Sequence, residues 1–148
     1  MSDPLDEELF LDLLKAGHRA RMRAHGASML PTILPGAEVE LEPRPRHLEP
    51  GDVVLARVGG RLVLHRLIAR RPGGELLLKG DALGRPDAPI SGEAVLGRAI
   101  RVSAGCPRDL RKGPGRWLGR AAAGASWLSW KVGRRLRRLV APRGVWHA

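Results

Sequence analysis

Ser28 and His65 are the two residues of this chain whose chemistry and surroundings could together support nucleophilic acyl transfer. Ser28 lies in a Gly/Pro-containing run over residues 26–33, and His65 lies further along in an apolar, strand-like run. A serine hydroxyl is a weak nucleophile at neutral pH and needs a base within hydrogen-bond reach, which histidine can provide. Serine is also an ordinary turn residue, so the sequence around the pair has to decide between a catalytic and a purely structural role.

The elements that would position this pair are predicted to be short strands joined by turns. Alternating and β-branched apolar patterns predict strands over residues 18–24, 38–42, 52–58, 61–69, 75–79 and 94–102. Gly59-Gly60 separates two of these runs, which is typical of a two-residue hairpin. A stripe of apolar residues over 4–16, ended by Gly17, predicts a helix before the strands, with Asp3 as its cap.

Charge divides the chain into a nearly neutral body and a basic tail. The net charge is +11 over 148 residues, and the residues from Pro107 onward contribute eleven Lys/Arg against the single acid Asp109. We therefore predict an N-terminal helix over 1–17, a β domain over 18–104, a linker over 105–115 and a basic amphipathic helical tail over 116–148. The expected fold class is mostly β.

The remaining composition argues against cofactor sites and secretion. Cys106 is the only cysteine, which excludes an intramolecular disulfide and a cysteine-based zinc cluster. The five histidines show no metal-ligand spacing, so we predict neither a metal nor another cofactor. The acidic N-terminus is unlike a signal peptide, and the longest uncharged run of the tail is about half the roughly 20 residues that a membrane span needs. A cytoplasmic location is expected.

Four ordered motifs carry a resemblance to a known family. Ser28-Met29-x-Pro31-Thr32, His65-Arg66 at the end of the hairpin, Lys79-Gly80-Asp81 and then Asp87 resemble the type I signal peptidase and LexA-like serine peptidase superfamily over residues 26–102. Many members place a lysine where this chain has His65. The histidine resembles the branch found in the endoplasmic reticulum, archaea and some spore-forming bacteria. The resemblance implies the β-ribbon fold of signal peptidases and LexA.

The resemblance also implies roles for individual residues. Ser28 would be the nucleophile and His65 its base, while Asp87, six residues after Asp81, would complete the catalytic group. Asp81 would be a buried hydrogen-bonding residue near the site, and the sequence leaves open whether Asp87 or Asp81 orients His65. The Ser28 N–H would stabilise the oxyanion. Relatives often carry a second, hydroxyl donor where this chain has Gly26, so that side-chain donor is missing or replaced.

These roles imply a serine endopeptidase that cleaves a peptide or pro-protein precursor. The alternative is a weakly active or inactive relative that binds peptides. Unlike true signal peptidases, this chain shows no transmembrane segment in its sequence. For the tail, contact of residues 116–140 with anionic lipid at the inner face of the membrane, packing of its Leu/Ala stripe on the β domain, and electrostatic binding of nucleic acid are open, with the first two favoured.

Overall fold

One antiparallel sheet makes up most of the protein, which confirms the prediction of a mostly β fold. The computed structural model describes residues 4–103, 107–110, 119–125 and 127–132. Helix α1 (Pro4–Lys15) precedes the strands. The strands are β1 (Ala20–Arg23), β2 (Glu38–Pro43), β3 (Val53–Val58), β4 (Arg61–Arg70), β5 (Leu76–Lys79), β6 (Val95–Ser103) and β7 (Pro107–Asp109), with the 3-10 turn η1 (Gly92–Ala94) before β6.

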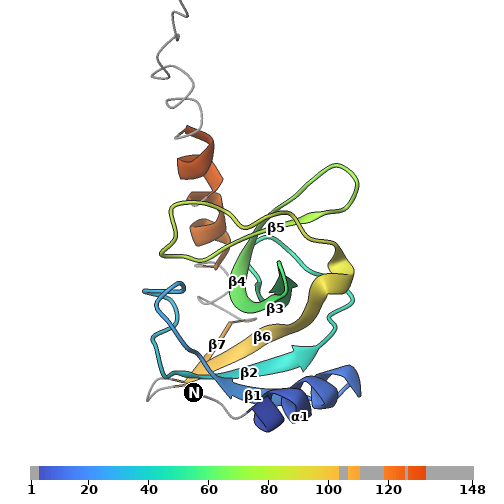
Figure 1. The fold of residues 1–148 in the computed structure, drawn as a ribbon. Helices are drawn as coiled ribbons and strands as arrows, with labels where there is room; N and C mark the ends of the chain where they lie inside the picture. Colours follow the sequence, from blue (N-terminus) through green and yellow to red (C-terminus); the bar gives the residue numbers. More distant parts are fainter. Residues whose placement is uncertain (1–3, 104–106, 111–118, 126, 133–148) are drawn as a thin grey trace, which may run out of the picture.

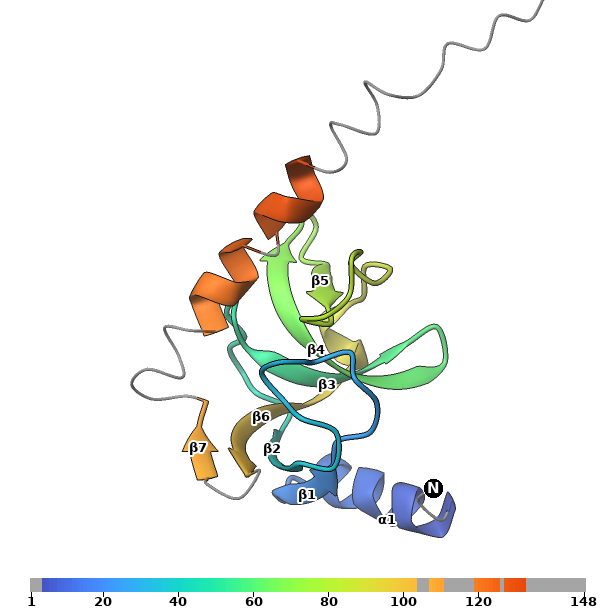
Figure 2. The same cartoon turned by 90° about the vertical axis from the view of Figure 1, so that its left-hand side faces the viewer.

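The strand order β1-β2-β6-β3-β4-β5 brings distant parts of the chain together (Figure 1). Residues of β1 and of β4 line the same cavity although three strands separate them in the sheet, so the sheet is curled. α1 covers the β1-β2-β6 end, as Figures 1 and 2 show from two sides. One buried cluster lies between α1 and the sheet, and a second lies among β3, β4 and β5. Both ends of the curled sheet are therefore fixed by apolar packing.

The predicted hairpin between β3 and β4 is present. Gly59 and Gly60 have φ values of 55° and 81°, a left-handed conformation that glycine adopts at little cost. Val58 pairs with Arg61 on the two sides of this turn, and the same register places His65 opposite Val54. The turn therefore sets the position at which His65 lies along the sheet.

α1 is held to the sheet by one apolar face. Leu11 and Leu14 are buried, and Leu14 Cδ2 would lie 3.6 Å from a Cβ built on Gly97 of β6. Gly17, at φ 89°, follows the helix and reverses the chain toward β1. The predicted helix and its end are confirmed, while its predicted cap, Asp3, lies outside the described residues.

The predicted linker contains a strand that the sequence did not indicate. β7 pairs with residues 101–103 of β6, whereas β3 pairs with β6 only over residues 95–98. β7 therefore takes up the part of β6 that β3 leaves uncovered. The pairing is set by a distant strand, which is why a Pro- and charge-rich segment could be mistaken for a linker.

The described part of the tail is helical over residues 119–125 and 127–132 and lies beside β4 (Figures 1 and 2). Ala123 is buried against Ile68 and Leu77, and Trp127 and Trp130 pack on the same cluster. The sequence-predicted stripe of the described tail is instead exposed: Ala121, Ala125, Leu128 and Val132. The described tail therefore packs on the body, but through Ala123, Trp127 and Trp130 rather than through the described part of the predicted stripe. None of the described helices has the length and hydropathy required to cross a membrane.

Arg98 links β6 to the turn that precedes β3. Its guanidinium donates to Glu42, with Nε 2.6 Å from Oε1, and lies 3.3 Å from Asp52. Burial lowers the pKa of Arg98, but the hydrogen bond to Glu42 and the charge of Asp52 outweigh it and raise the pKa overall. The Arg98 guanidinium therefore stays charged, and its contact with Asp52 fixes the turn at Gly51 and Asp52 against the sheet.

Candidate active site

His65 lies between Ser28 and Asp87 in a chain of hydrogen bonds. Its Nδ1 is 2.6 Å from Asp87 Oδ2, and its Nε2 is 3.2 Å from Ser28 Oγ. A carboxylate only accepts hydrogen bonds, so the hydrogen of a neutral imidazole lies on Nδ1 and Nε2 is left to accept from the serine hydroxyl. This is the arrangement that a general base needs to take the proton of Ser28.

The residues that follow Ser28 in the sequence anchor its turn in the hydrophobic core. Met29 is buried in the main core cluster, and Ile33, whose N–H donates to the Met29 carbonyl, is buried beside it. The Leu30–Pro31 peptide between them is cis. Because Met29 is buried, Ser28 is held at the surface of the turn, where it is partly exposed.

The Gly-Asp motif supports the same turn from the other side. Ala82 N–H donates to the Ser28 carbonyl at 2.9 Å. A Cβ on Gly80 would lie 2.7 Å from that carbonyl oxygen and 2.9 Å from the Leu83 side chain. Only glycine therefore permits the two loops to approach this closely. This explains why the motif has glycine at position 80.

Asp87 reaches His65 from the loop that follows β5. Its own N–H donates to the Leu78 carbonyl at 2.9 Å, which ties the loop back onto β5. The carboxylate is 17% exposed and the imidazole 7%. The pair is therefore largely shielded from water, which strengthens the charge-assisted hydrogen bond between them.

Asp81 takes no part in this chain of hydrogen bonds and pairs instead with Arg66. Arg66 Nε and Nη2 donate to the two Asp81 carboxylate oxygens at 2.8 and 2.6 Å, a bidentate pair. Arg66 Nη1 also donates to the Gly51 carbonyl at 2.7 Å, and Nη2 to Thr32 Oγ1 at 3.3 Å. One buried guanidinium thus joins the Ser28 loop, the hairpin, the Gly-Asp loop and the turn before β3. The sequence placed Arg66 within a motif but indicated no role for it.

The Ser28 N–H is directed to no acceptor in the part of the chain that the structure describes. Gly26 adopts φ 78°, and apart from its two chain neighbours no described residue has an atom within 4 Å of a Cβ built on it. A side chain at position 26 would have room, but the left-handed backbone disfavours it. The backbone N–H is therefore the donor that the site offers to an oxyanion.

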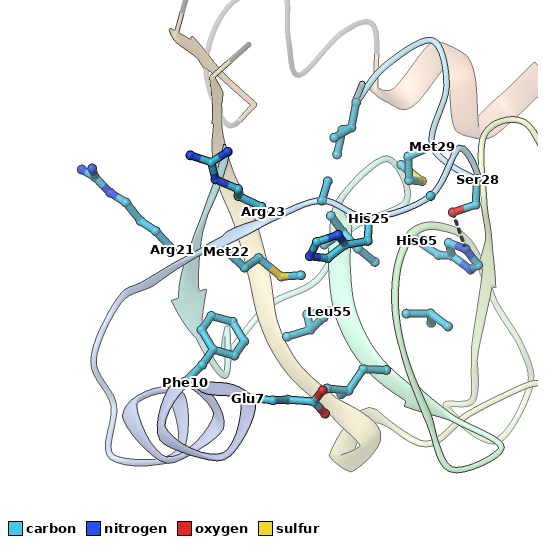
Figure 3. A pocket seen from close by; sticks show the side chains of 16 residues that line it. Glu7, Phe10, Arg21, Met22, Arg23, His25, Ser28, Met29, Leu55 and His65 are labelled. Atoms are coloured by element: carbon cyan, nitrogen blue, oxygen red, sulfur yellow. Dashed lines mark hydrogen bonds between the residues drawn. The ribbon is translucent and has the colours of Figure 1, made fainter. Parts of the chain in front are cut away.

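A cavity of about 610 Å³ opens beside Ser28 and His65 (Figure 3). Residues 21–26 line one side, residues 62–65 of β4 line the other, and Glu7 and Phe10 of α1 lie at the far end. His25, an exposed residue, also lines this cavity and points into it in Figure 3. The described residues include no group of three or more His, Cys, Asp or Glu that could hold a metal ion.

The curled antiparallel sheet, with Ser28 and His65 at its cavity and Asp87 hydrogen-bonded to His65, defines a serine peptidase-like fold. The chain belongs to the Peptidase S24-like family, whose model matches residues 3–100. This agrees with the resemblance seen in the motifs. None of the curated proteins matches the chain.

Proposed function

We propose that this protein is a signal-peptidase-like serine endopeptidase that cleaves a peptide or precursor protein through an acyl-enzyme. The observation that carries the proposal is the hydrogen-bonded chain from Ser28 through His65 to Asp87, with distances of 3.2 and 2.6 Å. Membership of a serine peptidase-like family supports it. No metal or other cofactor takes part in the proposed mechanism.

The proposed reaction has two halves. Ser28 Oγ attacks the peptide carbonyl carbon while His65 Nε2 takes the hydroxyl proton, and the oxyanion receives the hydrogen bond of the Ser28 N–H. His65 then returns the proton to the leaving amine as the C–N bond breaks, leaving an ester on Ser28. A water molecule, deprotonated by His65, hydrolyses the ester and restores the serine. Asp87 stabilises the imidazolium formed in each half.

Two free strand edges beside the cavity favour an extended peptide as the substrate. β1 pairs only with β2 among the described strands. Within the part of the chain that the structure describes, β4 pairs with β5 only from Arg66 onward, so residues 61–65 pair there with β3 alone. Both edges border the cavity that leads to Ser28. A peptide in the cavity could therefore add to the sheet through backbone hydrogen bonds.

Asp87→Asn is expected to reduce kcat by about 10³–10⁴-fold because asparagine donates as well as accepts and favours the wrong imidazole tautomer. Cleavage of a peptide mixture, followed by mass spectrometry, gives the rate. Asp12→Asn changes an exposed carboxylate paired with Lys15 and serves as the control, with a rate within about twofold of the parent. Equal rates for Asp87→Asn and the control would remove Asp87 from the mechanism.

We propose further that the tail holds the protein at the cytoplasmic face of an anionic membrane. Leu128 and Val132 are 58% and 48% exposed, and the residues from Pro107 onward carry eleven basic residues. Exposed apolar side chains beside basic ones favour binding to anionic lipid, which interacts with both kinds of group. Electrostatic binding of nucleic acid would need only the basic residues.

The full chain is expected to co-float with vesicles of phosphatidylcholine and phosphatidylglycerol in a density gradient. The double variant Leu128→Glu with Val132→Glu should weaken binding at least about tenfold, since each side chain contributes about 1.5 kcal/mol or more when buried. Leu9→Glu, on α1 at the other end of the molecule in Figure 1, is the control because Leu9 is 64% exposed. Equal flotation of the double variant and the control contradicts the proposal.

A further inference from the structure

We infer that Phe10 of α1 selects a large apolar side chain of the bound peptide at a position away from the cleaved bond. The inference rests on the proposed function only in taking the cavity as the peptide site. It assigns α1, which the sequence indicated merely as a helix before the β domain, a part in choosing the substrate. Phe10 is the only phenylalanine of the chain.

The cavity is continuous from the nucleophile to α1. Its lining includes Ser28 and His65 at one end and Phe10 at the other, within a volume of about 610 Å³. In Figure 3 the Phe10 ring lies across the cavity from Ser28, with Met22 and Leu55 between them. A peptide that presents its carbonyl to Ser28 while lying along this cavity would therefore bring another of its side chains to Phe10.

The far end of the cavity is apolar. Phe10, Met22 and Leu55 lie close together there in Figure 3, and Leu62 and Leu64 of β4 also line the cavity. Backbone pairing with β1 or β4 would hold any sequence equally, so discrimination has to come from side chains. Burial of a large apolar side chain contributes about 1.5–3 kcal/mol relative to its exposure. The apolar wall therefore favours Leu, Ile, Met or Phe over Ala at this position.

Three charged residues also line the cavity around this wall. Arg21 and Arg23 line the cavity too, but in Figure 3 their side chains extend away from Phe10 and Leu55, as expected for the residues that flank Met22 in a strand, and Arg21 pairs with Glu38 at 3.4 Å. Glu7 lies at the edge of the apolar end. Its carboxylate disfavours an acidic side chain there.

α1 holds Phe10 in place through residues on the same side of the helix. Leu11 and Leu14 are buried, at 8% and 1% exposure, and Phe10 packs against the cluster that contains Leu14. Leu9, which directly precedes Phe10 in the helix, is 64% exposed and does not line the cavity. Leu9 and Phe10 therefore differ in one respect that matters here, their access to the cavity, and form a matched pair for a test.

The test is a substitution scan of a peptide that the full-length protein cleaves. Each position is changed in turn between Ala and Leu, and kcat/KM is measured for the parent, Phe10→Ala, Phe10→Leu and Leu9→Ala. We expect one position, away from the cleaved bond, where Leu is preferred over Ala by about tenfold or more, as 1.5 kcal/mol implies. Phe10→Ala should reduce that preference at least about fivefold, Phe10→Leu should keep part of it, and Leu9→Ala should leave it unchanged.

Loss of helix stability alone would lower the rates for both peptides of a pair and leave their ratio intact, so the ratio reports on specificity. An unchanged ratio in Phe10→Ala, or equal changes in Phe10→Ala and Leu9→Ala, overturns the inference while leaving cleavage established. If the parent cleaves no peptide, the proposed activity fails instead. Fluorescence anisotropy of the same labelled peptides on the parent protein then decides the inference: an apolar preference that Phe10→Ala removes supports it, and equal affinities overturn it.

Discussion

Replacement of Ser28 by alanine is expected to reduce peptide cleavage by at least about 10³-fold. Without the hydroxyl, no acyl-enzyme can form, and the imidazole of His65, 3.2 Å from Ser28 Oγ in the parent, has no nucleophile to activate. The residual rate would come from binding and oxyanion stabilisation alone. Mass spectrometry of peptide products over time measures the loss, and an acylating probe should add its mass to the parent protein and not to the variant.

Ser91→Ala is the matched control, because Ser91 is exposed and its side chain makes no cap hydrogen bond at η1. It should cleave within about twofold of the parent. Thermal unfolding of both variants should resemble that of the parent, since Ser28 is part of a surface turn. A Ser28→Ala protein that cleaves as fast as Ser91→Ala would refute the serine mechanism. Peptide binding without cleavage by the parent would favour the alternative of a binding relative.

Features determined by neighbouring residues could be predicted from the sequence. The hairpin depends on Gly59-Gly60, whose positive φ values need nothing beyond the turn itself. α1 follows from its apolar stripe and from Gly17. The motif order was enough to propose Ser28, His65 and Asp87 as one group, which the structure brings within hydrogen-bond reach. The sequence left both aspartates open as partners of His65, because either could reach it from one loop.

Features determined by distant segments could not be predicted. β7 forms because β3 leaves part of β6 unpaired, which no pattern within residues 107–109 can indicate. Tail residues 119–132 have small or apolar residues on two faces, so the sequence could not say that Ala123 and Trp127 would pack on the body. The role of Arg66 is of the same kind. Its partners Thr32, Gly51 and Asp81 come from three separate loops.

Removal of the Asp81 charge is expected to lower the free energy of unfolding by about 3–5 kcal/mol, because it leaves the Arg66 guanidinium buried without a counter-charge. The side chains of Arg66 and Asp81 are only 3% and 8% exposed, so water cannot readily take the place of the lost carboxylate charge. A single domain is stable by only about 5–15 kcal/mol. Asp81→Asn should therefore unfold at a much lower urea concentration than the parent, measured by circular dichroism.

Arg66→Met combined with Asp81→Leu separates the cost of a lone charge from the contribution of the pair. The double variant removes both charges, so its loss of stability should be smaller than the sum of the two single losses. The exposed pair Arg21 and Glu38, at 3.4 Å with side chains 63% and 50% exposed, is the control. Its alanine variants should each cost less than about 1 kcal/mol. Additive losses at Arg66 and Asp81, or losses no larger than those of the control pair, would contradict the coupling. The Ser28 loop depends on the same guanidinium through Thr32, so Asp81→Asn should also lose activity under conditions where it remains folded.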